Sequence, residues 1–473
     1  MAESKSVKAI LKGLIWLLGI GVLAVGSLFA INATDEESSE QTQALLALLR
    51  DPPPPTEKNG FIDFLALAAP ANAPTYPIGL SQLEAYQKHS RGTPEGLLPD
   101  IGMDLKLLHR CRREFLACVK QKGMAATVDQ LLTRYAAFWL RYQVMREKPE
   151  FVDLVPAPER PEETIPRYQY LIYGHRLAML SAALHFNAGD RQGALKELES
   201  EFAFYRKAET GTSSLLLKMI SFAMLDNSAL FAAEMARRTS AADRAFFGRL
   251  EALVRSPTKD ELDVTASVNV TQARVAQFMR TRANIRVSDG EYAVLSNVGV
   301  APPKPWWEGV SPWLYRPNYS VNLFVAQSNI MLSVRELPSS EFLSGVEKLR
   351  SRARALAPGA LWRLVLSPAA QNDRLLSDYA LPAMYIGRMH GHAGLQTLVR
   401  LQVYLRSAGI QSAAEIARAL EGPLRNDYRQ PFKDKTMDFD PQAMEVGFPA
   451  EETYMSASGR DQMRVKGRVA LEL

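Results

Sequence analysis

The longest apolar stretch of the chain lies near its N-terminus. Residues 13–31 include no charged side chain, and an α-helix needs about 20 apolar residues to cross a bilayer. Basic residues precede this run and acidic residues follow it, a bias that places the N-terminus in the cytoplasm and the rest of the chain on the other side. We therefore expect a basic arm at 1–12 and a transmembrane signal anchor at 13–31. The flanking charges are Lys5, Lys8, Lys12, Asp35, Glu36, Glu37 and Glu40.

A cleaved signal peptide is the competing interpretation, because it also begins with basic residues. Its apolar region is usually about 7 to 15 residues long and ends in a site with small residues. Here the candidate sites are Leu28-Phe29-Ala30 and Ile31-Asn32-Ala33, and each has a large residue three positions before the cut. We therefore favour an uncleaved anchor. A second apolar stretch, 213–235, includes Lys218 and Asp226 and is expected to be a buried helix.

Residues 34–77 combine a short amphipathic pattern with clustered prolines. The pattern of residues 37–50 predicts a helix, and the four prolines from Pro52 to Pro55 end it, because proline cannot continue a helix and favours an extended conformation. An alanine- and proline-rich stretch follows at 66–77. This composition predicts a semi-rigid stalk between the membrane and the body.

Helical periodicity dominates residues 78–425. In the stretch 124–145, five large apolar residues recur at spacings of three and four, which places them on one face of a helix. Strand patterns are few in this region, so the fold class is mainly α. The five residues are Leu131, Leu132, Tyr135, Phe138 and Trp139. The predicted helices are 79–89, 104–122, 167–187, 190–208, 213–237, 240–255, 258–284, 318–335, 338–356, 366–387, 393–408 and 412–420.

One segment of this body has a recognisable helix-turn-helix pattern. In residues 180–207, Ala182 and Ala183 precede the turn Ala188-Gly189-Asp190, and Ala194, Leu195 and Leu198 follow it. Small residues let two helices approach closely, and glycine suits the turn between them. The segment resembles the helix-turn-helix of a tetratricopeptide repeat. The resemblance implies a solenoid-like packing of helical hairpins, and an ordinary two-helix hairpin is the alternative.

The pattern changes to alternation in residues 426–473. Met437 and Phe439 stand before the turn at Asp440-Pro441, and Val446 and Phe448 stand after it, which predicts a hairpin. Residues 461–473 alternate strictly between apolar and charged positions. Because a lone hairpin is only marginally stable in water, we expect a small antiparallel sheet packed on the helices, with a loop at 449–460.

Composition limits the possible classes of function. The hydrophobic fraction of 47% and the charged fraction of 23% are those of a globular protein. A net charge of +5 is too small to indicate nucleic-acid binding. The two cysteines, Cys111 and Cys118, fall within one predicted helix, where seven residues separate the Cα atoms by about 10 Å. A disulfide needs about 4.4 to 6.8 Å, so we expect free buried thiols.

The segment 301–320 is the strongest candidate for a binding surface. It contains half of the tryptophans of the chain together with two tyrosines and several prolines, so stiff aromatic faces could bind a glycan, a peptide or a cation. A membrane-facing loop and a buried plug between helices are the alternatives. The candidate residues are Trp306, Trp307, Trp313, Tyr315 and Tyr319.

Signs of catalytic or metal chemistry are weak. His390 and His392 are close in sequence, but zinc requires a third and a fourth ligand, so we expect a turn or a surface pair of histidines. The chain has no G-x-S-x-G, H-E-x-x-H, G-x-x-x-x-G-K-[ST] or G-x-G-x-x-G motif. We therefore predict no metal and no cofactor.

These observations lead to one function and one alternative. We expect a protein of the bacterial inner membrane that crosses the bilayer once and has most of its chain in the periplasm. It would act as a helical scaffold or binding protein for another envelope protein or peptide, because stacked helix pairs form concave binding surfaces. The alternative is an envelope hydrolase or lyase that acts on a glycan or peptide, with its cleft near residues 301–320.

Overall fold

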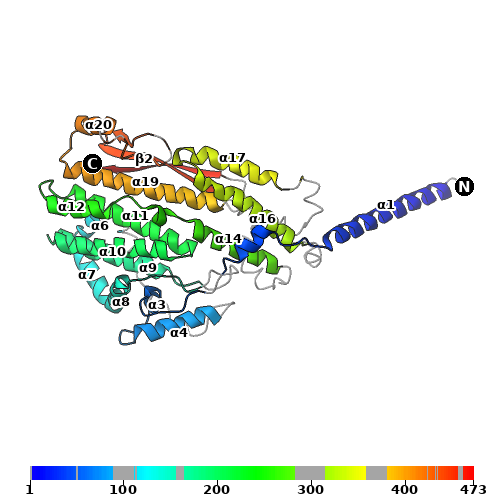
Figure 1. The fold of residues 1–473 in the computed structure, drawn as a ribbon, viewed down its shortest axis with the longest axis horizontal. Coiled ribbons are helices and arrows are strands. Elements are labelled where there is room, and N and C mark those ends of the chain that lie inside the picture. Colours follow the sequence, from blue (N-terminus) through cyan, green and yellow to red (C-terminus); the bar gives the residue numbers. More distant parts are fainter. Residues whose placement is uncertain are drawn as a thin grey trace.

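In the computed structural model, one long helix projects from a body of packed helices (Figure 1). This helix, α1 (Glu3–Asn32), exposes more than half of each large apolar side chain between Leu14 and Val25. Such an exposed apolar helix indicates a signal sequence or a membrane anchor. The structure describes residues 3–49, 52–88, 98, 111, 114–155, 165–282, 315–357, 359, 381–422, 424, 426–431, 433, 435–455 and 462–472.

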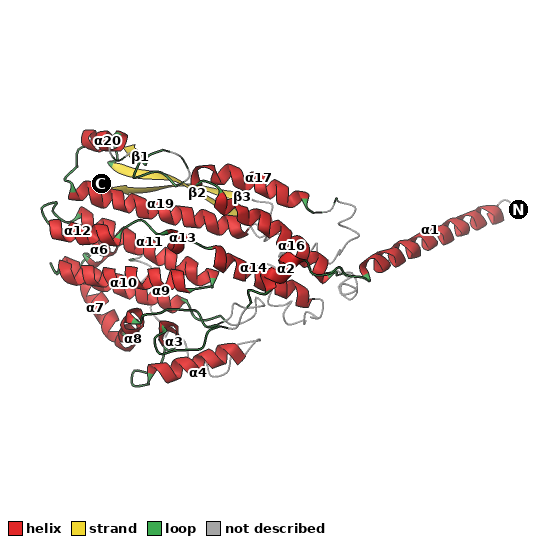
Figure 2. Cartoon of the chain, viewed as in Figure 1, coloured by secondary structure: helices red, strands yellow, loops and turns green. Residues whose placement is uncertain are grey.

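The body is mainly α, as predicted, with a small sheet near the C-terminus (Figure 2). Its N-terminal helices are α2 (Glu40–Leu46), α3 (Gly60–Leu65), α4 (Thr75–Lys88), α6 (Phe115–Val119), α7 (Met124–Arg134) and α8 (Ala136–Glu147). The central helices are α9 (Gln169–Asn187), α10 (Arg191–Gly211), α11 (Leu215–Arg237), α12 (Arg244–Leu253), α13 (Lys259–Leu262) and α14 (Thr265–Arg282). The last ones are α16 (Pro317–Leu332), α17 (Phe342–Ala355), α19 (Leu381–Ser407) and α20 (Ala413–Glu421).

Buried apolar side chains form three cores. The largest lies among α3 to α12, the second joins α2, α14, α16 and α17, and the third lies among the end of α19, α20 and the sheet. Helix α19 contributes to all three, with Ile386 in the second core, Val399 in the first and Leu405 in the third. Helix α11 is also long and apolar enough to cross a membrane, but most of it is buried inside the body.

Parts of the region predicted to be a stalk, 34–77, pack against the body. Helix α2 packs against α14 and α16, and every residue of α3 is buried, with Phe61 and Ile62 in the largest core. Asn59 caps α3 and also donates a hydrogen bond from Nδ2 to the carbonyl oxygen of Val152 at 2.9 Å. The prolines from Pro52 therefore connect two packed helices.

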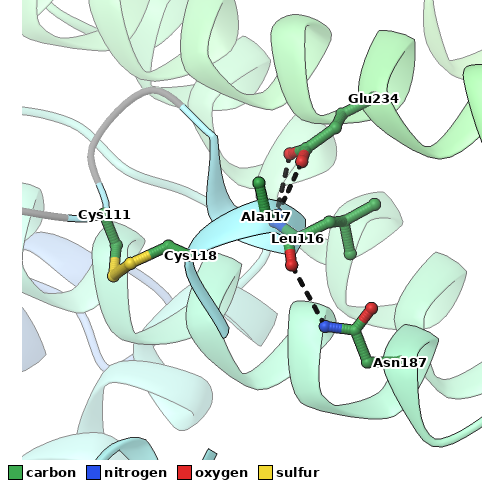
Figure 3. Close-up of a disulfide and its surroundings, with 6 residues drawn as sticks. All are labelled: Cys111, Leu116, Ala117, Cys118, Asn187 and Glu234. Carbon is green, nitrogen blue, oxygen red and sulfur yellow. Dashed lines mark hydrogen bonds between the residues drawn. A yellow bond between two sulfur atoms is a disulfide. The ribbon is translucent and has the colours of Figure 1, made fainter. Parts of the chain in front are cut away.

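The prediction of free thiols is wrong, because Cys111 and Cys118 form a disulfide (Figure 3). Cys111 lies in a turn and α6 begins only at Phe115, so the continuous helix that we expected across both cysteines is not formed. The two Cα atoms are consequently 5.4 Å apart. A disulfide is typical of proteins outside the reducing cytosol, so this bond supports an extracytoplasmic body.

Side chains from distant helices hold the disulfide loop in place. The carboxylate of Glu234 on α11 accepts hydrogen bonds from the backbone N–H groups of Leu116 and Ala117, at 3.1 and 2.9 Å (Figure 3). These are orphan donors at the start of α6, where a negative charge is favoured. Nδ2 of Asn187 donates to the carbonyl oxygen of Leu116 at 3.2 Å. The loop is therefore fixed to both α9 and α11.

The predicted helix-turn-helix is present as the hairpin α9–α10. Gly189 adopts a φ of +88° in the turn, a left-handed conformation that favours glycine, and Asp190 caps α10 by accepting from the backbone N–H of Gly193. Several helix boundaries differ from the sequence pattern, and the predicted helix 258–284 is divided into α13 and α14. The stretch 124–145 breaks at Tyr135 into α7 and α8, whereas the predicted gap between 387 and 393 lies inside the continuous helix α19.

The C-terminal strands form a three-stranded antiparallel sheet in the order β1-β2-β3. Strand β1 (Asp438–Asp440) pairs with β2 (Glu445–Met455) across the predicted turn, and β2 pairs with β3 (Gln462–Glu472). Val446 and Phe448 are buried against the helices, as the alternation predicted. The prediction of a loop at 449–460 is wrong for its first part, because β2 continues to Met455.

Candidate functional site

The predicted aromatic surface is described only at its C-terminal end. Trp306, Trp307 and Trp313 lie outside the described residues, so a platform that includes them stays a prediction. Tyr315 is 8% exposed, and its hydroxyl donates to the carbonyl oxygen of Met279 at 2.8 Å. Tyr319 is half-buried in the first turn of α16. Of these two tyrosines, only Tyr319 retains a partly accessible ring.

The start of α16 is joined to the segment that follows α1. The carboxylate of Asp35 accepts hydrogen bonds from the backbone N–H groups of Asn318 and Tyr319, at 2.7 and 3.1 Å. It thereby satisfies donors that have no partner within the helix, at the end where the helix dipole favours a negative charge. Nε of Arg316 lies 4.0 Å from the same carboxylate, and its guanidinium carbon lies 5.2 Å from the centroid of the Tyr319 ring.

Asn322, one turn further along α16, completes this junction. Its Nδ2 donates to Oε1 of Glu36 at 2.7 Å and to the carbonyl oxygen of Glu37 at 2.9 Å. Its Oδ1 accepts from the backbone N–H of Ser39 at 2.9 Å and from the hydroxyl of Thr42 at 2.8 Å. One side chain thus fixes four positions of the segment. We call the contacts that Asp35 and Asn322 make across this junction the α16 clamp.

A buried polar cluster joins α8, α9 and α10, with Glu201 at its centre. Oε1 of Glu201 accepts a hydrogen bond from Nη1 of Arg146 at 2.7 Å, and Oε2 accepts from Nδ1 of His175 at 2.6 Å. The hydroxyl of Tyr142 lies 3.2 Å from both carboxylate oxygens and 3.1 Å from the hydroxyl of Tyr205. All five side chains are 7% exposed or less. We call them the Glu201 cluster.

The electrostatics of the Glu201 cluster favour one charge state for each of three groups. Burial, together with the carboxylate of Glu201, raises the pKa values of Tyr142 and Tyr205 well above the ordinary value, so both phenols stay protonated. Burial opposes the charged form of Arg146, but the carboxylates of Glu201 and Glu197 outweigh it and raise its pKa. The cluster therefore holds a buried ion pair that is closed to solvent, a structural arrangement.

The sequence reasoning missed this cluster, although a signal was available. Tyr142 and Arg146 are four residues apart on α8, and Glu197, Glu201 and Tyr205 follow one another at the same spacing on α10. Residues with this spacing share a helix face, so polar groups recur on faces that also contain large apolar residues. When two such helix faces pack against each other, the polar groups of one face can form hydrogen bonds with those of the other.

The opposite side of α8 exposes apolar residues. Leu140 is 62% exposed and Val144 is 45% exposed, and Ala136 is exposed one turn before them. The spacing of four places the three side chains in one row along the helix. We call this row the α8 stripe. Its helix cannot rotate to bury the stripe, because its other face is held by Tyr142 and Arg146 in the Glu201 cluster.

The expectation of a turn or surface pair for His390 and His392 is wrong. Both lie inside α19, and burial lowers the pKa of His390 to about 4. His392 is 4% exposed, its ring stacks on Phe222 at a centroid distance of 4.6 Å, and its Nδ1 lies 2.7 Å from Oδ1 of Asp226. Side chains separated by two positions on a helix point to different sides. The two imidazoles therefore join α19 to different neighbours.

A small pocket lies between α3, α4 and α9. Phe64, Gln82, Tyr86, Arg167 and Tyr170 contribute to its lining. Leu98 also lines it, with its backbone N–H donating to Oε1 of Gln82 at 2.9 Å and its carbonyl oxygen accepting from Nη1 of Arg167 at 2.7 Å. Two of the polar side chains that line the pocket, Gln82 and Arg167, thus already bind the main chain.

Within the described part of the chain, no group of three or more His, Cys, Asp or Glu side chains could hold a metal ion. The arrangement therefore gives no coordination chemistry to argue from. Comparisons of the chain with protein-family models, with curated proteins and with solved structures found no match.

Proposed function

We propose that the protein is a scaffold or binding protein of the bacterial envelope, anchored in the inner membrane by α1 with its body in the periplasm. The charge bias around α1 and the Cys111–Cys118 disulfide support this topology. The proposed partner is another envelope protein or a peptide. We further propose that the helices around the α9–α10 hairpin stack in the manner of a solenoid, as the tetratricopeptide resemblance suggests.

The α8 stripe is the observation on which the proposed binding function rests. Leu140 and Val144, 62% and 45% exposed, lie one turn apart on a helix whose other face is fixed. Full burial of a large apolar side chain is worth roughly 1.5 to 3 kcal/mol, so a partner that covers these two half-exposed side chains would gain about half of that for each, and up to about 3 kcal/mol in all. A rigid, exposed apolar row suits the apolar face of an amphipathic helix or peptide.

The experiment is photo-crosslinking in intact membranes. A photoreactive amino acid at position 140 or 144 should crosslink to one stoichiometric envelope protein, and the same amino acid at the exposed polar position 129 on α7 should not. The double variant Leu140→Ser, Val144→Ser should weaken binding of that protein about a hundredfold, which corresponds to about 3 kcal/mol.

The matched control is Leu356→Ser, which replaces a leucine of similar exposure, 47%, after the end of α17. It should leave binding unchanged. Binding that survives the double variant on α8, or that both variants weaken equally, would contradict the proposal. Circular dichroism would verify that each variant is folded.

A further inference from the structure

The connection between α1 and the α16 clamp is very short. Only Ala33 and Thr34 separate the last residue of α1 from Asp35, so the Cα atoms of Asn32 and Asp35 are at most about 11 Å apart. The carboxylate of Asp35 lies 2.7 Å from the backbone nitrogen of Asn318. While the clamp is intact, the first turn of α16 must stay close to the end of α1.

Part of the last turn of α1 is shielded from solvent. Asn32 is 6% exposed, and Leu28 and Phe29 are half-buried. Further toward the N-terminus the helix is uncovered, with Trp16 74% exposed and Leu23 72% exposed. The shielded residues of α1 therefore lie where its apolar run ends, which is the level of the bilayer surface if α1 crosses the membrane.

We infer that the first turn of α16 is a membrane-facing site that contacts the lipid headgroup layer, and that the α16 clamp fixes the height of the body above the bilayer. The inference rests on the proposed role of α1 as an uncleaved anchor. The headgroup layer is roughly 5 to 7 Å thick on each side. A connection of at most about 11 Å from the end of α1 places Asp35 and the first turn of α16 within this layer or at its outer surface.

The charges at this end of the body favour a zwitterionic lipid. Four acidic residues lie next to the end of α1, and the side chain of Asp35 is 24% exposed. Among the described residues, Arg316 lies beside them, with its Nε 4.0 Å from the carboxylate of Asp35. Anionic headgroups would be repelled within a Debye length of about 10 Å. Headgroups that include an ammonium group, such as phosphatidylethanolamine and phosphatidylcholine, fit the site. The four carboxylates are those of Asp35, Glu36, Glu37 and Glu40.

Tyr319 gives the site its interfacial side chain. Its ring is half-buried, and desolvation raises the pKa of its hydroxyl, so the group stays neutral. A neutral ring with one polar atom suits the headgroup level of a bilayer. At the described end of the predicted aromatic segment, Tyr315–Ser320, the membrane-facing interpretation is therefore favoured over a glycan platform.

Energy transfer from the protein to labelled lipids tests this inference. The full-length chain with Tyr319→Cys would be labelled with a donor dye and reconstituted into phosphatidylcholine vesicles whose surface bears acceptor-labelled lipid. The substitution keeps the backbone N–H that Asp35 binds, and without reductant the disulfide leaves Cys111 and Cys118 unlabelled. The reference position is Leu140→Cys on α8, on the side of the body away from α1 (Figure 1).

Transfer from position 319 should be several-fold higher than from position 140. It should fall when Asp35→Ala and Asn322→Ala release the clamp, and it should not rise when phosphatidylglycerol replaces part of the phosphatidylcholine. Equal transfer from both positions would overturn the inference, and a rise with phosphatidylglycerol would overturn its charge argument. A chain that begins near Ala33 and washes off vesicles would instead contradict the anchor, whereas loss of crosslinking at α8 would contradict only the proposed binding function.

Discussion

Replacing Glu201 by glutamine should strongly destabilise the body. The carboxylate accepts a hydrogen bond from the charged Arg146 at 2.7 Å and one from His175 at 2.6 Å, and Tyr142 lies 3.2 Å from it. Glutamine has nearly the same shape, but it is neutral and replaces one acceptor oxygen by an NH₂ donor. That donor would face either the guanidinium of Arg146 or the N–H of His175. At least one buried donor then loses its acceptor.

The expected loss of stability follows from the partners that Arg146 retains when its ion pair with Glu201 is removed. After Glu201→Gln, the carboxylate that remains paired with Arg146 among the described residues is that of Glu197, outside the cluster, at 3.1 Å. Removing one partner of a buried ion pair costs about 3 to 5 kcal/mol. We expect the free energy of unfolding to fall by that amount, which is a large part of the ordinary stability of a folded protein, about 5 to 15 kcal/mol.

The assay is urea unfolding of the full-length protein in detergent, followed by near-ultraviolet circular dichroism. The control is Glu199→Gln, because Glu199 also binds an arginine, Arg249, at 2.6 Å, but both side chains are more than a third exposed. Exposed pairs contribute about 1 kcal/mol or less. If Glu201→Gln also costs less than about 1 kcal/mol, the Glu201 cluster does not hold α8, α9 and α10 together as argued.

Three other predictions concern stability. Burial and the nearby Glu261 raise the pKa of Glu209 to about 9 from an ordinary value of 4.5, so the folded chain retains a proton that the unfolded chain releases. The free energy of unfolding should therefore fall as the pH rises from about 4.5 to about 9. Glu209→Gln should flatten this pH dependence in unfolding experiments at several pH values. An unchanged dependence would count against a buried, protonated Glu209. Cys111→Ser with Cys118→Ser should lower the free energy of unfolding by about 2.5 kcal/mol, and the unfolded, unreduced wild type should resist alkylation at both positions. Ser412→Ala should remove the capping box of α20 and cost about 1 kcal/mol, whereas Ser412→Thr should keep most of it, as hydrogen exchange in α20 would reveal.

The sequence predicted those parts of the fold that depend on local pattern. The apolar run of α1, the hairpin α9–α10 and the turn between β1 and β2 all follow from residue spacing over a few turns of chain. The predicted helix 412–420 is present as α20, with Ser412 as its N-cap. In contrast, α12 begins after Asp243 and not at 240, where the pattern placed its start, because Ser240 and Asp243 offer the same capping chemistry and local pattern cannot choose between them.

The features that the sequence could not predict depend on contacts between distant residues. Glu234 binds the start of α6 from more than a hundred positions away, so nothing near Cys111 indicated that the helix would begin too late to separate the cysteines. The hydrogen bonds of Asn322 to the segment after α1 span a still longer separation. The predicted aromatic platform remains a prediction, since its three tryptophans lie outside the described residues.

The course of α19 through all three cores has a consequence for how the body unfolds. Losing α19 would expose Ile386, Val399 and Leu405 at once, so no core can open by releasing this helix without weakening the other two. Cores that share one element lose their independence, and local opening becomes as costly as global unfolding. The three apolar centres should therefore melt in a single transition, and the amide protons in the middle of α19 should be among the last to exchange with solvent.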